Sequence, residues 1–249
     1  MKTILLTNDD GVISAGLQTL RKELADEYDV YVVAPDRERS ATSMALTLHT
    51  PLRLASIDKR TYSVTGTTCD CVNLALQRIL PAKPDFVVSG MNLGENLADD
   101  IFFSGTVGGA FSAYLCGIPA LAVSLLAAPG DPKNYDFSGG AILCKRLLKK
   151  LLHLCTEPLV LNLNIPALHN GKIMVTRLGR KRYKPQIEER CDPRGQSYYW
   201  IGPGNPVCSG SEDTDIWAVN NGYASLGVIH YDLNGSDKLG WAQENFDER

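Results

Sequence analysis

Apolar runs and helix-spaced apolar positions alternate along the first two thirds of the chain. Residues 2–7 and 29–34 each contain an unbroken apolar run, which is typical of strands buried on both faces of a sheet. Between them, Leu17, Leu20 and Leu24 recur at helical spacing and predict an amphipathic helix. The same reasoning predicts strands at 51–57, 61–65, 85–89, 119–126 and 158–166, and helices that begin near Ser14, Thr68, Ser104 and Ser138.

This alternation predicts an α/β fold in which a mainly parallel sheet is covered by helices on both faces, giving three layers, αβα. After residue 166 the pattern changes to strand-like segments with no convincing helix between them, at 171–178, 197–202 and 223–231. We therefore expect a helix-covered core over residues 1–166 and a small antiparallel, β-rich appendage over residues 167–249.

Composition and charge exclude several classes of protein. The 249 residues, 44% of them hydrophobic, are ample for a large core, yet no apolar stretch approaches the roughly 18 residues that cross a bilayer. The N-terminal apolar run is too short for a signal peptide. A net charge of −3 gives no footprint for a nucleic-acid polymer. Cys69 and Cys71 lack the spacing of a zinc or redox pair, so we expect seven free thiols in a cytoplasmic protein.

Two adjacent carboxylates, Asp9 and Asp10, follow the first predicted strand in the segment TNDDG. Adjacent like charges repel, and a tight turn needs at most one of them. Ligands of open parallel α/β sheets bind outside the carboxyl ends of the strands. Two later strand ends also carry oxygen donors, Ser40 and Asn92. We therefore expect these side chains to meet at one edge of the sheet.

Such a set of donors suits a hard divalent cation. Carboxylate, hydroxyl and amide oxygens, without Cys or His, are the ligands that Mg²⁺ or Mn²⁺ prefers. A cation would also explain how two neighbouring carboxylates stay ionised beside apolar strands. The alternative is a tight turn with solvated side chains, which explains the TNDDG segment by itself but not the donors at the other strand ends.

The segment SGTVGG is a second candidate feature, because it follows a loop of about a dozen residues, a length typical of functional loops. Ser104, Gly105 and Thr106 begin a predicted helix whose free N–H groups and dipole favour an anion such as phosphate. The alternative is that the glycines permit close helix–sheet packing and Ser104 only caps the helix. A cation beside a phosphate cradle would indicate phosphoryl chemistry.

Positive charge is concentrated in the segment RLGRKRYK at 177–184. Two interpretations are open: the segment attracts an anionic substrate, or it is a solvated surface hairpin. The four histidines show no pair at ligand spacing, and we expect them to be structural or exposed.

Six motifs carry a resemblance to a known family: TNDDG at 7–11, VVAPDRERSATS at 32–43, VVSGMNLGENLADDIFFSGTVGGA at 87–110, VTRLGRKRY at 175–183, DPRGQSYYWIG at 192–202 and TDIWAVNNGYASL at 214–226. The six motifs span nearly the whole chain. On them, the sequence resembles the stationary-phase survival protein SurE family of metal-dependent nucleotidases. The resemblance implies a Rossmann-like catalytic core and hydrolysis of nucleoside 5′- and 3′-monophosphates. It also implies that short polyphosphate is a further possible substrate.

The resemblance also implies roles for single residues. The family's ligands for one divalent cation per subunit, Mg²⁺ or Mn²⁺, fall here on Asp9, Asp10, Ser40 and Asn92. Positions that line its phosphate pocket fall on Asn96, Ser104, Gly105 and Thr106. A C-terminal hairpin and tail that exchange between subunits imply a homodimer or homotetramer.

The chain departs from the family pattern at several positions. Ala41 and Ala98 stand where the family usually has Gly, Phe103 replaces a common Tyr, and the segment 226–229 lacks the usual Thr-Pro. All four metal-ligand positions are intact. The departures therefore bear on loop conformation, substrate preference and assembly.

The hypothesis for the reaction is direct attack of a metal-activated water on phosphorus, with the pair Asp9 and Asp10 as the catalytic residues. Asp9 is the one expected to orient or deprotonate the water, and a phospho-aspartate intermediate is the alternative. Two non-enzymatic alternatives are a receiver-like signalling domain and a nucleotide-binding module. The first needs a phospho-accepting Asp at the end of its third strand, where this chain has Ser-Gly-Met-Asn.

Overall fold

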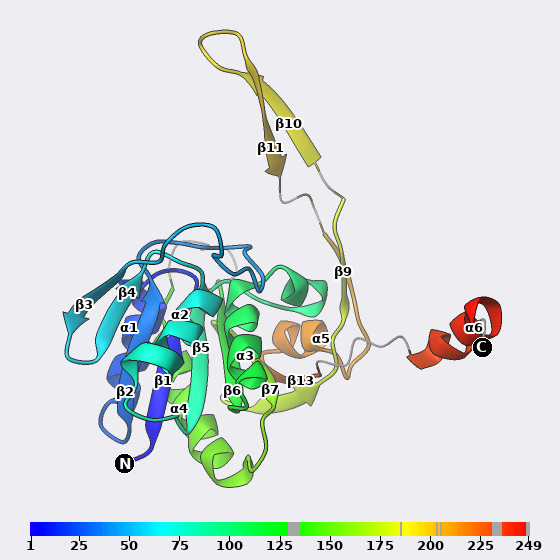
Figure 1. Cartoon of the computed structure of the whole chain (residues 1–249). Helices are drawn as coiled ribbons and strands as arrows, with labels where there is room; N and C mark the ends of the chain where they lie inside the picture. The colour runs from blue at the N-terminus through cyan, green and yellow to red at the C-terminus, as the bar shows by residue number, and fades with distance from the viewer. Residues whose placement is uncertain (129–134, 185, 203, 205, 231–235, 248–249) are drawn as a thin grey trace.

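The computed structural model describes residues 1–128, 135–184, 186–202, 204, 206–230 and 236–247. Within these residues, one nine-stranded sheet has the order β3-β4-β2-β1-β5-β6-β7-β13-β8 (Figure 1). Its strands are β1 Thr3–Thr7, β2 Asp29–Pro35, β3 Leu54–Asp58, β4 Thr61–Val64, β5 Phe86–Leu93, β6 Ala120–Leu126, β7 Val160–Pro166, β8 Ile173–Thr176 and β13 Ala224–Ile229. Neighbouring strands from β4 to β7 are parallel, whereas the pairs β3–β4 and β7–β13 are antiparallel.

Helices cover both faces of this sheet. They are α1 Ala15–Leu24, α2 Thr68–Leu74, α3 Gly105–Leu115, α4 Ser138–Leu154 and α5 Asp215–Asn220, with a π-helical turn at Ala75–Ile79 and a 3₁₀ turn, η2, at Ala98–Phe102. A further helix, α6 Ser236–Phe246, lies away from the sheet (Figure 1). Side chains alternate along a strand. Ile4 and Leu6 of β1 therefore pack with α1 and α4, while Leu5 packs with α2 and α3. This two-sided burial explains the continuous apolar runs in the sequence.

The predicted α/β class, with its three layers, mainly parallel sheet and small antiparallel pairs, is confirmed. The antiparallel pairs join β10 Gln186–Cys191 to β11 Ser197–Gly202, and β9 Arg180–Arg182 to β12 Val207–Ser209. The β10–β11 hairpin projects far from the body (Figure 1). The domain boundary after residue 166 stays a prediction, and two strands beyond it, β8 and β13, are hydrogen-bonded into the main sheet. No helix in the described ranges is long and apolar enough to span a membrane.

Two local predictions were wrong. Helix α5 lies where no helix was expected, because its six residues are too few to show a periodic stripe. Thr67, not Thr68, caps α2: its hydroxyl accepts from Asp70 N while the Asp70 carboxylate accepts from Thr67 N, a capping box. The hydroxyl of Thr68 instead donates to the backbone oxygen of Asn8, which ties α2 to the end of β1.

The strand order places a switch point between β1 and β5, because the chain leaves β1 for β2 on one side and later adds β5 on the other. Ligands of open α/β sheets bind outside the carboxyl ends of the strands at such a point. Asp9 and Asp10 follow β1, and Asn92 lies in the last residues of β5. Asp9, Asp10 and Asn92 thus lie at the edge of the sheet where open α/β folds bind ligands.

Two of the departures from the family pattern lie at unusual backbone conformations. Ala41 has a φ of 57° and Ala98 a φ of 49°, both in the left-handed region, which favours glycine. The backbone N–H of Ala98 donates to the buried carboxylate of Asp215 at 2.7 Å. Tertiary contacts therefore hold alanine in a conformation that glycine adopts without steric cost.

Candidate cation and phosphate site

Asp9 is fixed against the start of α3. Its side chain is buried, and its Oδ1 accepts a 2.5 Å hydrogen bond from Thr106 Oγ1. A Cβ on Gly105 would lie 2.8 Å from Asp9 Oδ2, so the approach needs glycine. The backbone oxygen of Asp9 accepts from Arg39 N at 2.7 Å, which joins the TNDDG turn to the loop after β2. These contacts leave the carboxylate little freedom.

Asp10 is half-buried, and its Oδ2 accepts a 3.0 Å hydrogen bond from Leu93 N at the end of β5. Burial, then the charge of Asp9, raises the pKa of Asp10 to about 6. Burial also raises the pKa of Asp9, although hydrogen bonds from Thr106 oppose it. Within the described residues, neither carboxylate forms an ion pair with Lys, Arg or His. The pair is therefore without a cationic partner in the part of the chain that the structure describes.

Ser40 lies in the loop after β2, next to the residue that bonds Asp9. Its hydroxyl donates to Glu38 Oε1 at 2.8 Å, so its proton is engaged and its oxygen lone pairs can coordinate a cation. Sequence reasoning did not single out Glu38. Its charge nevertheless contributes to the raised pKa of both Asp9 and Asp10.

Asn92 is oriented in a comparable way. Its Nδ2 donates to Gly94 O at 2.9 Å, so the side-chain oxygen is the amide atom that can coordinate a cation. The adjacent Leu93 N–H binds Asp10. Asn92 is thus brought to the carboxylate pair as the sequence predicts.

The side chains present fit a hard cation. Two carboxylates without a protein cation, a hydroxyl and an amide oxygen form the all-oxygen donor set that Mg²⁺ and Mn²⁺ prefer. No group of three or more His, Cys, Asp or Glu suited to a metal occurs in the part of the chain that the structure describes. A cation site on the two Asp residues therefore needs further donors, and Ser40 and Asn92 stay the predicted ones.

Three of the four residues predicted to line a phosphate pocket, Ser104, Gly105 and Thr106, lie at the start of α3, as expected, but two of their hydroxyls are already engaged. Ser104 Oγ accepts from Val107 N at 3.0 Å and so caps the helix. Thr106 donates its hydroxyl proton to Asp9. The helix N-terminus and the bare backbone of Gly105 remain as the anion-binding elements.

Asn96 lies in the loop between β5 and α3, where it is buried in a cluster of polar side chains. Its Nδ2 donates to Ser124 Oγ at 2.8 Å, and its backbone N–H donates to Asn164 Oδ1. Its backbone oxygen accepts from the side-chain amides of Asn162 and Asn164. These contacts fix the loop; a contact of Asn96 with phosphate stays a prediction.

Sequence reasoning missed several residues that shape the site. Asn162 and Asn164 share one face of β7, and an amide every second residue of an otherwise apolar strand is the signal that could have found them. Asp215 accepts from Ala98 N and Gly179 N, at 2.7 Å each, and so joins the same loop to the start of β9. No local pattern marks Asp215.

We predict that cation affinity falls as the pH drops through about 6. A cation requires ionised carboxylates, and the pKa of Asp10 is raised to about 6 in the metal-free protein. Below that pH each bound proton must leave, so we expect about a tenfold rise in the Kd for Mn²⁺ per pH unit. Because the folded protein holds these protons more tightly than the unfolded chain, the pair should also make the metal-free protein more stable as the pH falls from about 6 towards 4.

Mn²⁺ isotherms by calorimetry from pH 5 to 8 measure this dependence. Asp10→Asn removes the group and should flatten the inflection near pH 6 in what binding remains. A Kd for the native chain that does not change between pH 5 and 7 would contradict the assignment of Asp10.

Comparisons with known proteins agree with one another. The model of the family described as survival protein SurE matches residues 4–185. A protein named 5′-nucleotidase SurE from Pelotomaculum thermopropionicum is 44% identical, covering 92% of this chain and 90% of that protein. One of the same name from Geobacter metallireducens is 46% identical, covering 95% and 94%. The crystal structure of the SurE protein from Aquifex aeolicus is similar with a TM-score of 0.82 and 39% identity, covering 97% of this chain and 98% of that one.

Proposed function

This chain belongs to the survival protein SurE family, and from that premise we propose that it is a phosphomonoesterase, a 5′-nucleotidase. It hydrolyses nucleoside 5′- and 3′-monophosphates to nucleoside and phosphate, with short polyphosphate as a possible further substrate. Members of the family are metal-dependent. The finer proposal is one Mg²⁺ or Mn²⁺ per subunit, held by Asp9, Asp10, Ser40 and Asn92.

One observation carries this proposal: two carboxylates that form no ion pair with a Lys, Arg or His of the described residues lie at the switch point of the sheet, beside a helix that begins at Gly105. When bound there, a divalent cation supplies a Lewis acid that polarises a phosphoryl oxygen and lowers the pKa of water. Thr106 holds Oδ1 of Asp9, and the fixed carboxylate orients the attacking water and accepts its proton. The N–H groups at the start of α3 stabilise the negative charge that develops on the phosphoryl oxygens.

Direct attack of water and a phospho-aspartate intermediate predict different fates for oxygen in a single turnover. In ¹⁸O-labelled water, direct attack places the label in the released phosphate and leaves the enzyme carboxylates unlabelled. Label in the carboxylate of Asp9 or Asp10 would instead favour the covalent route.

A panel of metals and substrates tests the function itself. Phosphate release from nucleoside 5′- and 3′-monophosphates with Mn²⁺, Mg²⁺ or a chelator should require the metal and decide which ester position is preferred. A chain that binds nucleotides but releases no phosphate with any metal would be a nucleotide-binding module, and the proposal would be wrong.

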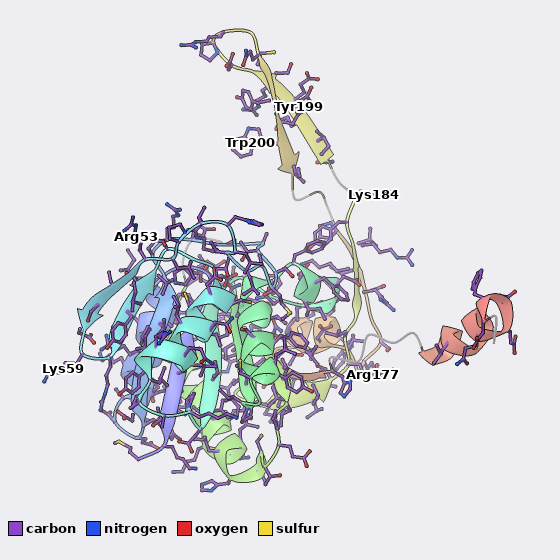
Figure 2. The ribbon with its side chains drawn as sticks, viewed as in Figure 1. Arg53, Lys59, Arg177, Lys184, Tyr199 and Trp200 are labelled. Carbon is purple, nitrogen blue, oxygen red and sulfur yellow. The ribbon has the colours of Figure 1, made fainter. Side chains whose placement is uncertain are left out.

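The proposal includes a homodimer or homotetramer assembled through the C-terminal part. Two apolar surfaces support it. The β10–β11 hairpin exposes Tyr199 and Trp200, each 60% accessible (Figure 2). A cleft of about 450 Å³ runs beside α3 and is lined by apolar side chains that include Phe102, Phe111 and Val228. Sedimentation at micromolar concentration should show a dimer or tetramer, and a monomer would contradict this part of the proposal.

Substrate and compartment follow the same proposal. The proposed binding partner is a nucleoside monophosphate, and we propose that the protein binds neither a nucleic-acid polymer nor a membrane. We place the protein in the cytoplasm, because all seven cysteines are free thiols.

A further inference from the structure

Lys181 is a largely buried lysine at the base of the projecting hairpin, on β9. Its side chain is 10% exposed, whereas Arg180 and Arg182 on either side are exposed. Its Nζ lies 2.6 Å from Asp100 Oδ2 and 3.2 Å from Glu95 Oε1. Burial opposes the ammonium, but the hydrogen bond with Asp100 and the charge of Glu95 raise the pKa of Lys181 above its usual range.

The loop between β5 and α3 supplies every acidic partner in this cluster. The backbone N–H of Lys181 donates to Asp99 Oδ2 at 2.6 Å, and the Tyr183 hydroxyl donates to Asp100 Oδ1. Nζ also lies 5.6 Å from the centre of the Tyr183 ring. The strand β9 and the residue after it thus bind Glu95, Asp99 and Asp100 through a single ammonium, a backbone N–H and a phenol.

The same loop forms one wall of the candidate site. It begins just after Asn92 and ends at Ser104, the cap of α3, and its residue Phe103 accepts from Ser43 N in the loop that carries Ser40. Glu95 lies in this loop between Asn92 and Asn96, two of the candidate residues of the site. Charge on this loop therefore acts on anything that binds at the site.

We propose that Lys181 is a positioning residue for the phosphate group of the substrate: it neutralises Glu95 and Asp100 and so keeps the loop beside the phosphate pocket from repelling the anion. The inference rests on the proposed phosphomonoesterase function and gives a role to one cation of the RLGRKRYK segment. Lys181 does not touch the substrate; it acts through the loop.

Charge balance gives the physical reason. A phosphomonoester carries about 1.5 to 2 negative charges at pH 7. Without the ammonium, two carboxylates on the loop beside this anion lose their cationic partner, and one of them, Asp100, has a side chain only 13% exposed and little screening by water. A cation responds in the opposite direction, because additional negative charge attracts it. Loss of Lys181 should thus weaken the binding of phosphate but not of Mn²⁺.

The test compares Lys181→Met with Arg182→Met, which removes the same charge from the neighbouring exposed position. Calorimetry measures inorganic phosphate binding to the Mn²⁺-loaded full chain, and Mn²⁺ binding in a separate titration. Lys181→Met should weaken phosphate binding about tenfold, or ~1.4 kcal/mol, with the Kd for Mn²⁺ unchanged or lower. Arg182→Met should change both by less than twofold, and Lys181→Arg should stay close to native.

Removing the two carboxylates as well distinguishes an electrostatic role of Lys181 from a structural one. Adding Glu95→Gln and Asp100→Asn to Lys181→Met should restore phosphate binding. Equal loss of Mn²⁺ and phosphate affinity in Lys181→Met, or no rescue, would overturn the proposal, since a purely structural role predicts both. If Lys181→Met does not fold, Glu95→Gln with Asp100→Asn in the native background should tighten phosphate binding, and unchanged or weaker binding would overturn the proposal. Both titrations measure binding and need no turnover. A chain that releases no phosphate from nucleotides would therefore refute the proposed phosphomonoesterase function, while the role of Lys181 in phosphate binding would be decided by the titrations.

Discussion

Replacing Asp9 by Asn should lower kcat/KM for nucleoside monophosphates by about a thousandfold or more, the loss typical of removing a group that acts only in the transition state. The amide keeps the shape and still accepts the hydrogen bond of Thr106, but it neither carries the charge that holds a cation nor accepts a proton. Burial raises the pKa of Asp9, which means that the ionised carboxylate destabilises the folded metal-free protein. The variant should therefore be at least as stable as the metal-free native chain.

Asp36→Asn is the matched control, because Asp36 lies at the same edge of the sheet, directly after β2, and pairs with Arg37 and Arg39. Its activity should stay within a few-fold of native. Phosphate release is followed at saturating Mn²⁺, and stability by thermal unfolding with a chelator present. An Asp9→Asn variant with activity close to native would refute the assignment of Asp9.

Gly105→Ala should reduce activity about a hundredfold without changing any chemical group of the site. A Cβ at this position would lie 2.8 Å from Asp9 Oδ2, 3.0 Å from Asp9 Cβ and 3.1 Å from Thr42 Oγ1. Asp9 or the helix must shift, and a displacement of about 1 Å at a catalytic group costs on the order of a hundredfold. The Kd for Mn²⁺ should rise as well, because the carboxylate leaves its place among the donors.

Gly240→Ala on α6 is the control for the substitution itself, because a Cβ there meets nothing within 4 Å. Alanine is the better helix former, so this variant should keep its activity and lose no stability. If Gly105→Ala kept native activity and native Mn²⁺ affinity, the close approach of α3 to Asp9 would have no functional meaning.

The sequence predicts the site where local pattern and topology coincide. Near-continuous apolar runs indicate parallel strands, and donors directly after those runs must lie at one edge of the sheet. Asp9, Asp10, Ser40 and Asn92 could be found in this way. The left-handed backbone at Ala41 and Ala98 could be anticipated as well, because the family that the sequence resembles usually has glycine there.

The rest depends on contacts between distant parts of the chain. Ala98 and Asp215 are 117 positions apart, and Lys181 meets Asp100 across 81 positions. No periodicity encodes such pairs, since they arise from the order in which strands enter the sheet. Asp215 lies in a six-residue helix that is too short to show a periodic pattern. Lys181 meets its partners because β9 packs beside η2, a contact that follows from the fold of the whole chain.

The most direct test of this account is a Mn²⁺ titration in which cation binding and phosphate release from a nucleoside 5′-monophosphate are measured on the same sample. We expect one Mn²⁺ per subunit, activity that rises in proportion to occupancy, and loss of both in Asp9→Asn. Full phosphate release in the presence of a chelator, or native Mn²⁺ affinity in a chain that lacks both carboxylates, would contradict the account.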